Sequence, residues 1–547
     1  MRKYMFLILT FLIQSATIQA QPAGAPVVRP KLVVGIVVDQ MRWDYLYRYY
    51  NIYGDGGFKR MLNEGFSCEN TYINYLPSTT AVGHTCIYTG SVPSITGISG
   101  NDWTEQLTGV HVYCTDDSTV QPVGVNSSPD GKMSPRNLLV TTITDELRMA
   151  TQFQSRVVGI SLKDRAAILP AGHTANAAFW MDDETGSFIS STYYMNKLPE
   201  AVIKFNKEKY IEKYLQRGWN TLYPISTYVA SDSDNKSYEG KFPGESNPVF
   251  PHDIKAAYAK SHSIFRSTPY GNSLTLEFAK TVLDAYQLGQ GSVPDFLTIN
   301  CASTDYAGHL FGPNSIEVED VYLRLDQDLA SFFTELDSKI GKGNWLVFLT
   351  ADHGAAHAVG YSQEKRIPAD FFVSRDILAN LTQLIQEKFG ISNAIRSGEN
   401  YQIIFDLAKI AAANADFDAI KKLAVGYLKK QPGVAYAVDM EKIQDASVPE
   451  PIRTMIINGY NYKRSGQIQV VFQPAWLESY SRTGTTHGTW NPYDTHIPLI
   501  FMGWDIHPGA TASLVHMTDI APTLATLLHI QAPNGNIGTP IVDLLTR

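Results

Sequence analysis

Three aspartates stand just beyond the ends of three separate apolar runs, and this pattern constrains the fold more than any other feature of the chain. They are Asp39 after residues 33–38, Asp305 after residues 296–299 and Asp352 after residues 345–349. Functional groups in open α/β sheets gather beyond the carboxyl ends of parallel strands, so distant segments can deliver all three carboxylates to one place. His309 and His353 stand at ligand-like spacing beside two of them. Together these residues predict a shared metal site and hydrolytic chemistry.

Apolar runs alternate with helical patterns through most of the chain, which is typical of an α/β fold with a mainly parallel sheet flanked by helices. The clearest helical pattern runs from Val318 to Ile340, after a cap at Asn314 or Ser315. Asp305 and Asp352 are therefore joined by strand, helix and strand. A right-handed crossover of this kind returns the chain to the same edge of the sheet.

Two stretches fit the alternation of strands and helices poorly, near residues 174–272 and 395–470. Neither is bounded by a linker rich in Pro, Gly and Ser, so we expect insertions or caps on a single catalytic domain that spans residues 21–547. Further core strands are expected at residues 156–162 and 497–502.

Residues 1–20 have the layout of a secretory signal peptide, with Arg2 and Lys3 before a short apolar stretch and then small and polar residues. The apolar stretch is shorter than the roughly 20 residues that a membrane span needs. No later stretch is long and apolar enough to span a membrane. We therefore expect a periplasmic or secreted bacterial protein, with an uncleaved anchor as the alternative.

The amino-acid composition limits which binding partners and which disulfide bonds are expected. With 547 residues, of which 44% are hydrophobic and 18% charged, the chain can bury a large core. A net charge of -8 gives none of the basic footprint of nucleic-acid binding, so no DNA or RNA partner is expected. Four cysteines leave two alternatives open: one or two disulfides, with Cys68–Cys86 suggested by proximity alone, or buried thiols.

The segment from Pro77 to Thr85 is expected to be a loop that enters a helix. A hydroxyl at a helix N-terminus lies in a positive field with free N–H groups nearby, which favours an alkoxide and a bound phosphate. The alternative is ordinary N-capping, because Ser and Thr are common caps.

Several short motifs occur together and in order along the chain. They are Asp39, Thr80 within Ser78–His84, Thr304–His309, Ala351–Gly354 and Thr486–Thr489. This set closely resembles the alkaline phosphatase superfamily. The segments Ser161–Arg165 and Gly100–Trp103 make it similar to the phosphate-irrepressible bacterial alkaline phosphatases with a threonine nucleophile. The resemblance runs from about residue 31 to the C-terminus.

The resemblance implies two Zn²⁺ ions per chain, a nucleophile and a phosphate-binding set. One ion would be held by Asp39, Asp352 and His353 with Thr80, and the other by Asp305, His309 and His487. Thr80 would attack a phosphate monoester and form a covalent phosphothreonine, which water then hydrolyses. Asn101, Lys163 and Arg165 would contact the phosphoryl oxygens. Because Lys163 and Arg165 follow an apolar strand two residues apart, we expect both on one face. A monomer acting on small-molecule monoesters is expected.

Other functions share part of this residue pattern. A phosphodiesterase or nucleotide pyrophosphatase has a similar metal set, but Lys163 and Arg165 should favour the more highly charged monoester. A sulfatase needs a C/S-x-P-x-R pattern that the Thr80 segment lacks, and a cofactor-independent phosphoglycerate mutase uses serine and lacks an export signal. An inactive binding protein would not need all six ligands. His84 and His357 are expected to have packing or structural roles.

Overall fold

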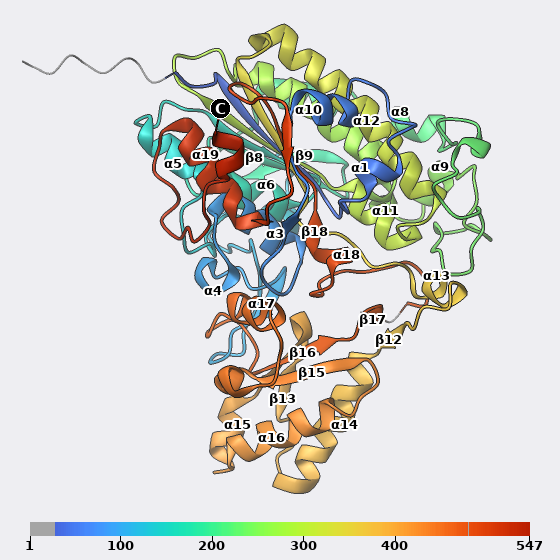
Figure 1. The fold of residues 1–547 in the computed structure, drawn as a ribbon, viewed down its shortest axis with the longest axis vertical. Coiled ribbons are helices and arrows are strands. Elements are labelled where there is room, and N and C mark those ends of the chain that lie inside the picture. Colours follow the sequence, from blue (N-terminus) through green and yellow to red (C-terminus); the bar gives the residue numbers. More distant parts are fainter. Residues whose placement is uncertain (1–27, 480, 547) are drawn as a thin grey trace, which may run out of the picture.

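The structure is a computed structural model that describes residues 28–479 and 481–546, so the predicted signal peptide at residues 1–20 lies outside the described residues. A ten-stranded sheet, ordered β20-β2-β19-β11-β1-β10-β7-β8-β9-β6, forms the centre of the larger part of the molecule (Figure 1). Five neighbouring strands at its centre pair in parallel: β11 (Trp345–Thr350), β1 (Leu32–Val38), β10 (Asp295–Cys301), β7 (Val157–Ile160) and β8 (Ala177–Asp182). The predicted α/β class with a mainly parallel sheet is confirmed.

The three strands that precede the three aspartates are neighbours. β1 pairs in parallel with β10 on one side and with β11 on the other, and every residue of all three strands is buried. Near-continuous apolar runs are what such a position requires, because helices cover both faces of the sheet. The crossover from β10 to β11 therefore passes over β1, and the three strands end side by side.

Three further strands differ from the expected pattern. β19 (Leu499–Gly503), in the stretch predicted at residues 497–502, is antiparallel to β11. β8 and β9 (Ser187–Ser191) belong to the large sheet although they lie within residues 174–272, which were expected to be an insertion. Only the later part of that range, with α7 (Glu200–Lys207), α8 (Tyr210–Arg217) and α9 (Ile254–Tyr258), leaves the sheet. The edge strands β20 (Gly509–Thr511) and β6 (Pro122–Val123), with β2 (Phe66–Cys68) between β20 and β19, complete it.

The predicted helix between Asp305 and Asp352 is α12 (Ile316–Leu336), and its N-cap is Ser315, whose Oγ accepts a hydrogen bond from Val318 N at 3.2 Å. α12 packs with α10 (Tyr270–Ala285) on one side of the sheet. α3 (Thr80–Thr89), α6 (Asp164–Ala171), α5 (Ile143–Ala150) and α19 (Ile520–Leu528) gather on the other side (Figure 1). α11 (Ser303–Phe311) follows β10 directly.

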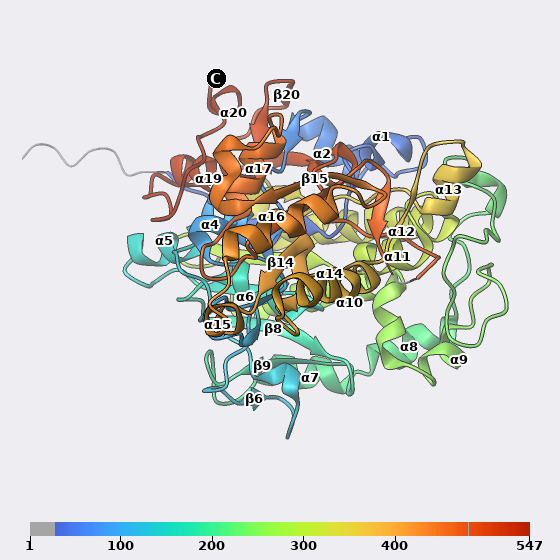
Figure 2. The same cartoon turned by 90° about the horizontal axis from the view of Figure 1, so that it is seen from below.

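Residues 370–478 form a separate lobe that lies below the large sheet in Figure 1 and faces the viewer in Figure 2. The strands β12 (Asp370–Phe372) and β17 (Trp476–Glu478) pair at its base. Its four-stranded sheet is ordered β13 (Ile395–Ser397), β14 (Gln402–Phe405), β16 (Ile468–Phe472) and β15 (Val434–Asp439). The helices α14 (Ser374–Phe389) and α16 (Phe417–Leu428) complete a hydrophobic cluster of its own, together with α15 (Leu407–Ala412). The range near 395–470, predicted as an insertion, lies within this lobe.

The four cysteines are free thiols, and each is buried. The suggested Cys68–Cys86 disulfide is therefore wrong: Cys68 lies on strand β2 and Cys86 within α3. Burial raises the pKa of Cys68 to about 12, which keeps this thiol protonated and unreactive. Across the described part of the chain, none of the helices combines the length and apolar character needed to cross a bilayer.

Candidate active site and metal centre

The three aspartates meet at the carboxyl edge of the sheet, as their positions after the strands led us to expect. Asp39 follows β1 directly, and its N–H donates to the carbonyl of Cys301, the last residue of β10, at 3.1 Å. Asp352 lies two residues after β11, and Asp305 lies in the first turn of α11. All three carboxylates are buried. A buried carboxylate is costly unless a positive charge or hydrogen bonds compensate it, so three together demand a cation.

Asp39, Asp352 and His353 form the first cluster of ligand-type atoms. His353 Nε2 lies 3.6 Å from Asp39 Oδ1 and 3.4 Å from Asp352 Oδ2. None of these three buried atoms has a hydrogen-bond partner among the described residues. The other ring nitrogen, His353 Nδ1, contacts the carbonyl of Gly354 at 3.0 Å. A carbonyl partner at Nδ1 fixes the proton there and leaves Nε2 as a lone-pair donor, which is the usual state of a metal-binding imidazole.

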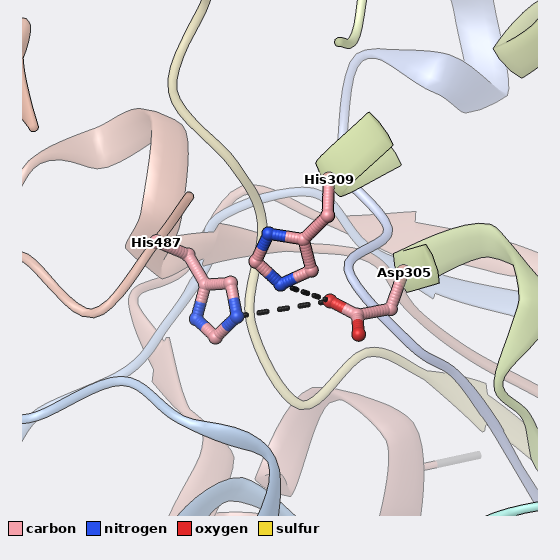
Figure 3. Close-up of side chains that lie close together, drawn as sticks. All are labelled: Asp305, His309 and His487. Carbon is pink, nitrogen blue, oxygen red and sulfur yellow. Dashed lines mark ion pairs between the residues drawn. The ribbon is translucent and has the colours of Figure 1, made fainter. Parts of the chain in front are cut away.

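Asp305, His309 and His487 form the second cluster (Figure 3). Asp305 Oδ1 lies 3.2 Å from His309 Nε2 and 3.7 Å from His487 Nε2. Each histidine turns its Nδ1 to a carbonyl at 2.8 Å, that of Thr485 for His309 and that of Ser78 for His487. Burial, together with the nearby His353 and His309, holds the pKa of His487 well below its usual range, so its ring is neutral as a ligand must be.

The two clusters adjoin each other, and both consist of ligand types that a divalent cation can take. Asp39, Asp305 and His353 can also direct their ligand atoms to one point, so the clusters share an edge. Burial raises the pKa of Asp39, and repulsion from Asp352 adds to this rise, which marks a surplus of buried negative charge. A donor set of imidazoles and carboxylates suits Zn²⁺, and Mn²⁺ or Fe²⁺ could use the same atoms.

Lys163 supplies a buried positive charge between the clusters. Its Nζ lies 2.8 Å from Asp39 Oδ2, 2.7 Å from Asp305 Oδ2 and 3.4 Å from Thr80 Oγ1. Burial alone would lower its pKa, but the carboxylates of Asp305 and Asp39 outweigh burial and raise it, so the amine is protonated. The ammonium therefore keeps the carboxylates of Asp39 and Asp305 and the hydroxyl of Thr80 close together.

Thr80 is the first residue of α3, while Thr79 occupies the N-cap position without a capping side-chain bond. The hydroxyl of Thr80 thus lies at the positive end of the helix and is not used as a cap. Asn101 is fixed beside it, because its Oδ1 accepts a hydrogen bond from Ala81 N at 2.9 Å. Only the Nδ2 group of Asn101 is then left to donate to an anion.

Arg165 lies near the start of α6 and is held by a tyrosine. Its Nη1 donates to Tyr113 Oη at 3.1 Å, while its buried Nε has no hydrogen-bond partner among the described residues. Lys163 and Arg165 both lie beyond the end of β7. The expectation that the alternation of side chains along a strand puts both on one face therefore does not apply to them. Lys163 is the N-cap of α6 and turns to the carboxylates, whereas Arg165 keeps a donor free for an anion.

Gln40 is a site residue that the sequence did not indicate. Its N–H donates to Asp352 Oδ1 at 3.1 Å, and its Nε2 donates to Asp305 Oδ1 at 2.7 Å. It adopts φ 64°, which is uncommon for a residue with a side chain. One residue thus supports a carboxylate in each cluster. A glutamine next to Asp39 carries no recognisable motif, so only the geometry could reveal it.

Two histidines expected to have packing or structural roles do lie beside the site or near it. His84 Nδ1 lies 2.9 Å from the carbonyl of Thr80 and 3.3 Å from Asp352 Oδ2, so it borders the first cluster. His357 contacts Asn314 and Arg42 and is not part of either cluster. Burial lowers the pKa of His357 to about 3, so its ring is neutral.

The sequence of this chain is similar to a known protein family and to several known proteins. Residues 33–496 match the family described as type I phosphodiesterase / nucleotide pyrophosphatase. The chain is 53% identical to alkaline phosphatase PafA of Elizabethkingia meningoseptica, with 99% of each chain covered. It is also 53% identical to alkaline phosphatase PhoV of Synechococcus elongatus, with 97% of this chain and 96% of the relative covered.

Solved structures of a PafA alkaline phosphatase share the fold. The wild-type crystal structure matches with a TM-score of 0.94 and 53% identity, covering 95% of this chain and 100% of the other. A second crystal structure, with a TM-score of 0.93, is of a PafA mutant in which one threonine, one asparagine, one lysine and one arginine are replaced.

Proposed function

The chain belongs to the type I phosphodiesterase / nucleotide pyrophosphatase family, within the alkaline phosphatase superfamily, and we propose that it is an alkaline phosphatase that hydrolyses small phosphate monoesters. The observation that carries the proposal is that six ligand-type side chains gather at the edge of the sheet, and that Lys163 contacts both Thr80 and two of their carboxylates. Two relatives that bear the name alkaline phosphatase are each 53% identical to it over nearly their whole length, which supports the same activity.

The residue roles are part of the proposal. The four residues replaced in the PafA mutant are of the same types as Thr80, Asn101, Lys163 and Arg165, and they follow one another at the same spacing. Thr80 is the proposed nucleophile: its Oγ attacks phosphorus, the ester bond breaks and the alcohol leaves. Water then cleaves the bond between Thr80 and phosphorus, which releases phosphate and restores the hydroxyl.

The charges around Thr80 match the needs of these steps. Lys163, 3.4 Å from Thr80 Oγ1, stabilises the alkoxide that attacks. Asn101 Nδ2 and Arg165 Nε are the donors proposed for the phosphoryl oxygens that face away from Thr80. When bound, two Zn²⁺ ions at the clusters would lower the pKa of the attacking groups and stabilise the leaving oxygen.

The alternative activity is that of a phosphodiesterase, which the family description also includes. The two can be separated by measuring kcat/KM for a monoester, a diester and a sulfate ester on one zinc-loaded preparation. We expect the monoester to be preferred, because Lys163 lies 3.4 Å from Thr80 and Arg165, two residues further along, is the second cation proposed for the phosphoryl group. A higher kcat/KM for the diester would contradict the proposal.

The proposed cofactor, location and assembly need their own measurements. Elemental analysis should find two zinc ions per chain that a chelator removes together with activity, and one ion or none would contradict the two-ion site. Export to the periplasm or medium rests on the composition of residues 1–20 and is tested by cell fractionation. A monomer is proposed, and light scattering tests it.

A further inference from the structure

The short turn Glu399–Tyr401, between β13 and β14, brings the lobe into contact with the candidate active site. Two consecutive residues of the turn, Asn400 and Tyr401, adopt φ 57° and φ 59°. Asparagine tolerates this left-handed region, but a bulky tyrosine there is strained. Gln469 on β16 donates its Nε2 to the carbonyl of Tyr401 at 3.1 Å and so helps to hold the turn in place. Strain of this kind persists only where surrounding contacts impose it.

Tyr401 reaches from the lobe to the main chain of His487. Its hydroxyl donates to the carbonyl of His487 at 2.6 Å, and its ring packs edge-on against Phe472 with the centroids 5.1 Å apart. Gly488, at φ 111°, leaves room for this contact, because a Cβ there would lie 2.7 Å from the tyrosine oxygen. His487 is therefore held at two points: its carbonyl by the lobe, and its ring Nδ1 by the carbonyl of Ser78.

Asn400 reaches the other side of the site. Its Nδ2 donates to the carbonyl of Asp102 at 2.7 Å. A Cβ on Gly100 would lie 2.3 Å from the same Nδ2, so the absence of a side chain there allows the approach. Asn101 lies between these two contacts, with its own side chain tied to Ala81 N. The lobe thus bonds the backbone after Asn101, at Asp102, and approaches it closely before Asn101, at Gly100.

We propose that Asn400 and Tyr401 are positioning residues, through which the lobe fixes His487 for the second metal cluster and Asn101 for the phosphoryl group. This inference rests on the proposed function, because it assigns the turn a task in that same site. A turn that served only as packing between the lobe and the sheet would need neither a strained tyrosine nor hydrogen bonds aimed at these two backbone carbonyls.

The two contacts should have separable effects. Tyr401→Phe removes one hydroxyl and keeps the ring, and we expect it to weaken zinc binding about tenfold, as the loss of a supporting contact to a metal ligand does. Asn400→Gly removes the amide and relaxes the backbone, so we expect zinc binding to be kept. Displacement of Asn101 should lower kcat/KM for a monoester by roughly ten- to a hundredfold.

Matched controls come from the same lobe. Asn393 also has a positive φ, of 51°, so Asn393→Gly relaxes the backbone in the same way, and Tyr427→Phe on α16 removes a different lobe hydroxyl. Zinc release to a chelator, kcat, KM and melting temperature are measured for the full chain and all four variants.

The expected outcome is faster zinc release only in Tyr401→Phe and a lower kcat/KM at full zinc in Asn400→Gly, with both controls like the unmodified protein. The inference is overturned if both turn variants match their controls, or if each loses zinc and activity only in proportion to a lower melting temperature. The proposed function is tested separately, on the unmodified protein, and it is overturned if that protein binds no zinc or hydrolyses no monoester. The comparison of the variants with their controls does not test it.

Discussion

Replacing Lys163 by Met should destabilise the metal-free protein far more than the zinc-loaded protein. The buried ammonium lies 2.8 Å from Asp39 and 2.7 Å from Asp305, and its side chain is only 1% exposed. Methionine has a similar length and no charge, so packing changes little and the two carboxylates lose their counter-charge. Removing one partner of a buried ion pair costs about 3–5 kcal/mol, which is the loss expected without metal.

Zinc should restore most of this loss, because bound cations supply the positive charge that the variant lacks. In saturating zinc we expect a difference of about 1 kcal/mol in the free energy of unfolding, which is typical of a single substitution. The measurement is urea unfolding followed by tryptophan fluorescence, for the wild type and Lys163→Met, in chelator and in zinc. Each variant is compared with the wild type in the same solution, since zinc stabilises both.

Lys421→Met is a matched control. This lysine is equally buried, but it pairs in the lobe with Asp418, Asp439 and Glu441. Its loss should lower stability by the same amount with and without zinc. If Lys163→Met were to lose equal stability in both solutions, the clusters would not hold cations beside Asp39 and Asp305, and the reasoning would be refuted.

Three other outcomes are expected. Thr80→Ser should retain part of the activity, whereas Thr80→Ala should form no phosphoenzyme in rapid-quench experiments with a labelled monoester; a phosphoenzyme in the alanine variant would remove Thr80 from its role. Arg165→Ala should lower kcat/KM for a monoester at least about tenfold more than for a diester, since a monoester carries one more charge, and equal losses on the two substrates would argue against a part in selectivity. Burial opposes the charge on His252, but Glu245 and Glu317 raise its pKa to about 9, above the usual value near 6.5. The stabilisation from His252 is therefore present below about pH 6.5 and lost as the pH rises through about 9; the urea midpoint of the wild type should fall more between pH 7 and pH 10 than that of His252→Gln, and parallel falls would count against the ion pairs.

Local sequence patterns were enough to predict the strands that carry the site. The apolar runs before Asp39, Asp305 and Asp352 became β1, β10 and β11, and the periodic segment between the last two became α12. Fully buried strands and long amphipathic helices leave a strong local signal, because burial dictates the residue type at each position. Apolar runs did not reveal β8. Its short apolar run stands directly before a long polar stretch, so both were assigned to the predicted insertion.

Contacts between distant segments could not be predicted from local sequence patterns. The pairing of β1 with both β10 and β11, which brings the aspartates together, is a property of the sheet and not of any one run. The bonds of Gln40 to Asp305 and Asp352 and the reach of Tyr401 to His487 join segments that share no local pattern.

The sequence by itself determined which chemical groups are available: six ligand-type side chains, a threonine at a helix start and two cations after one strand. These are properties of residue type and spacing, which each segment carries alone. Only the tertiary structure decided that Lys163 turns to Asp39 and Asp305 while Arg165 turns to Tyr113, and that a lobe late in the chain reaches the main-chain carbonyls of Asp102 and His487. The physical reason is that side-chain direction and charge compensation depend on which buried groups become neighbours, and long-range packing chooses those neighbours.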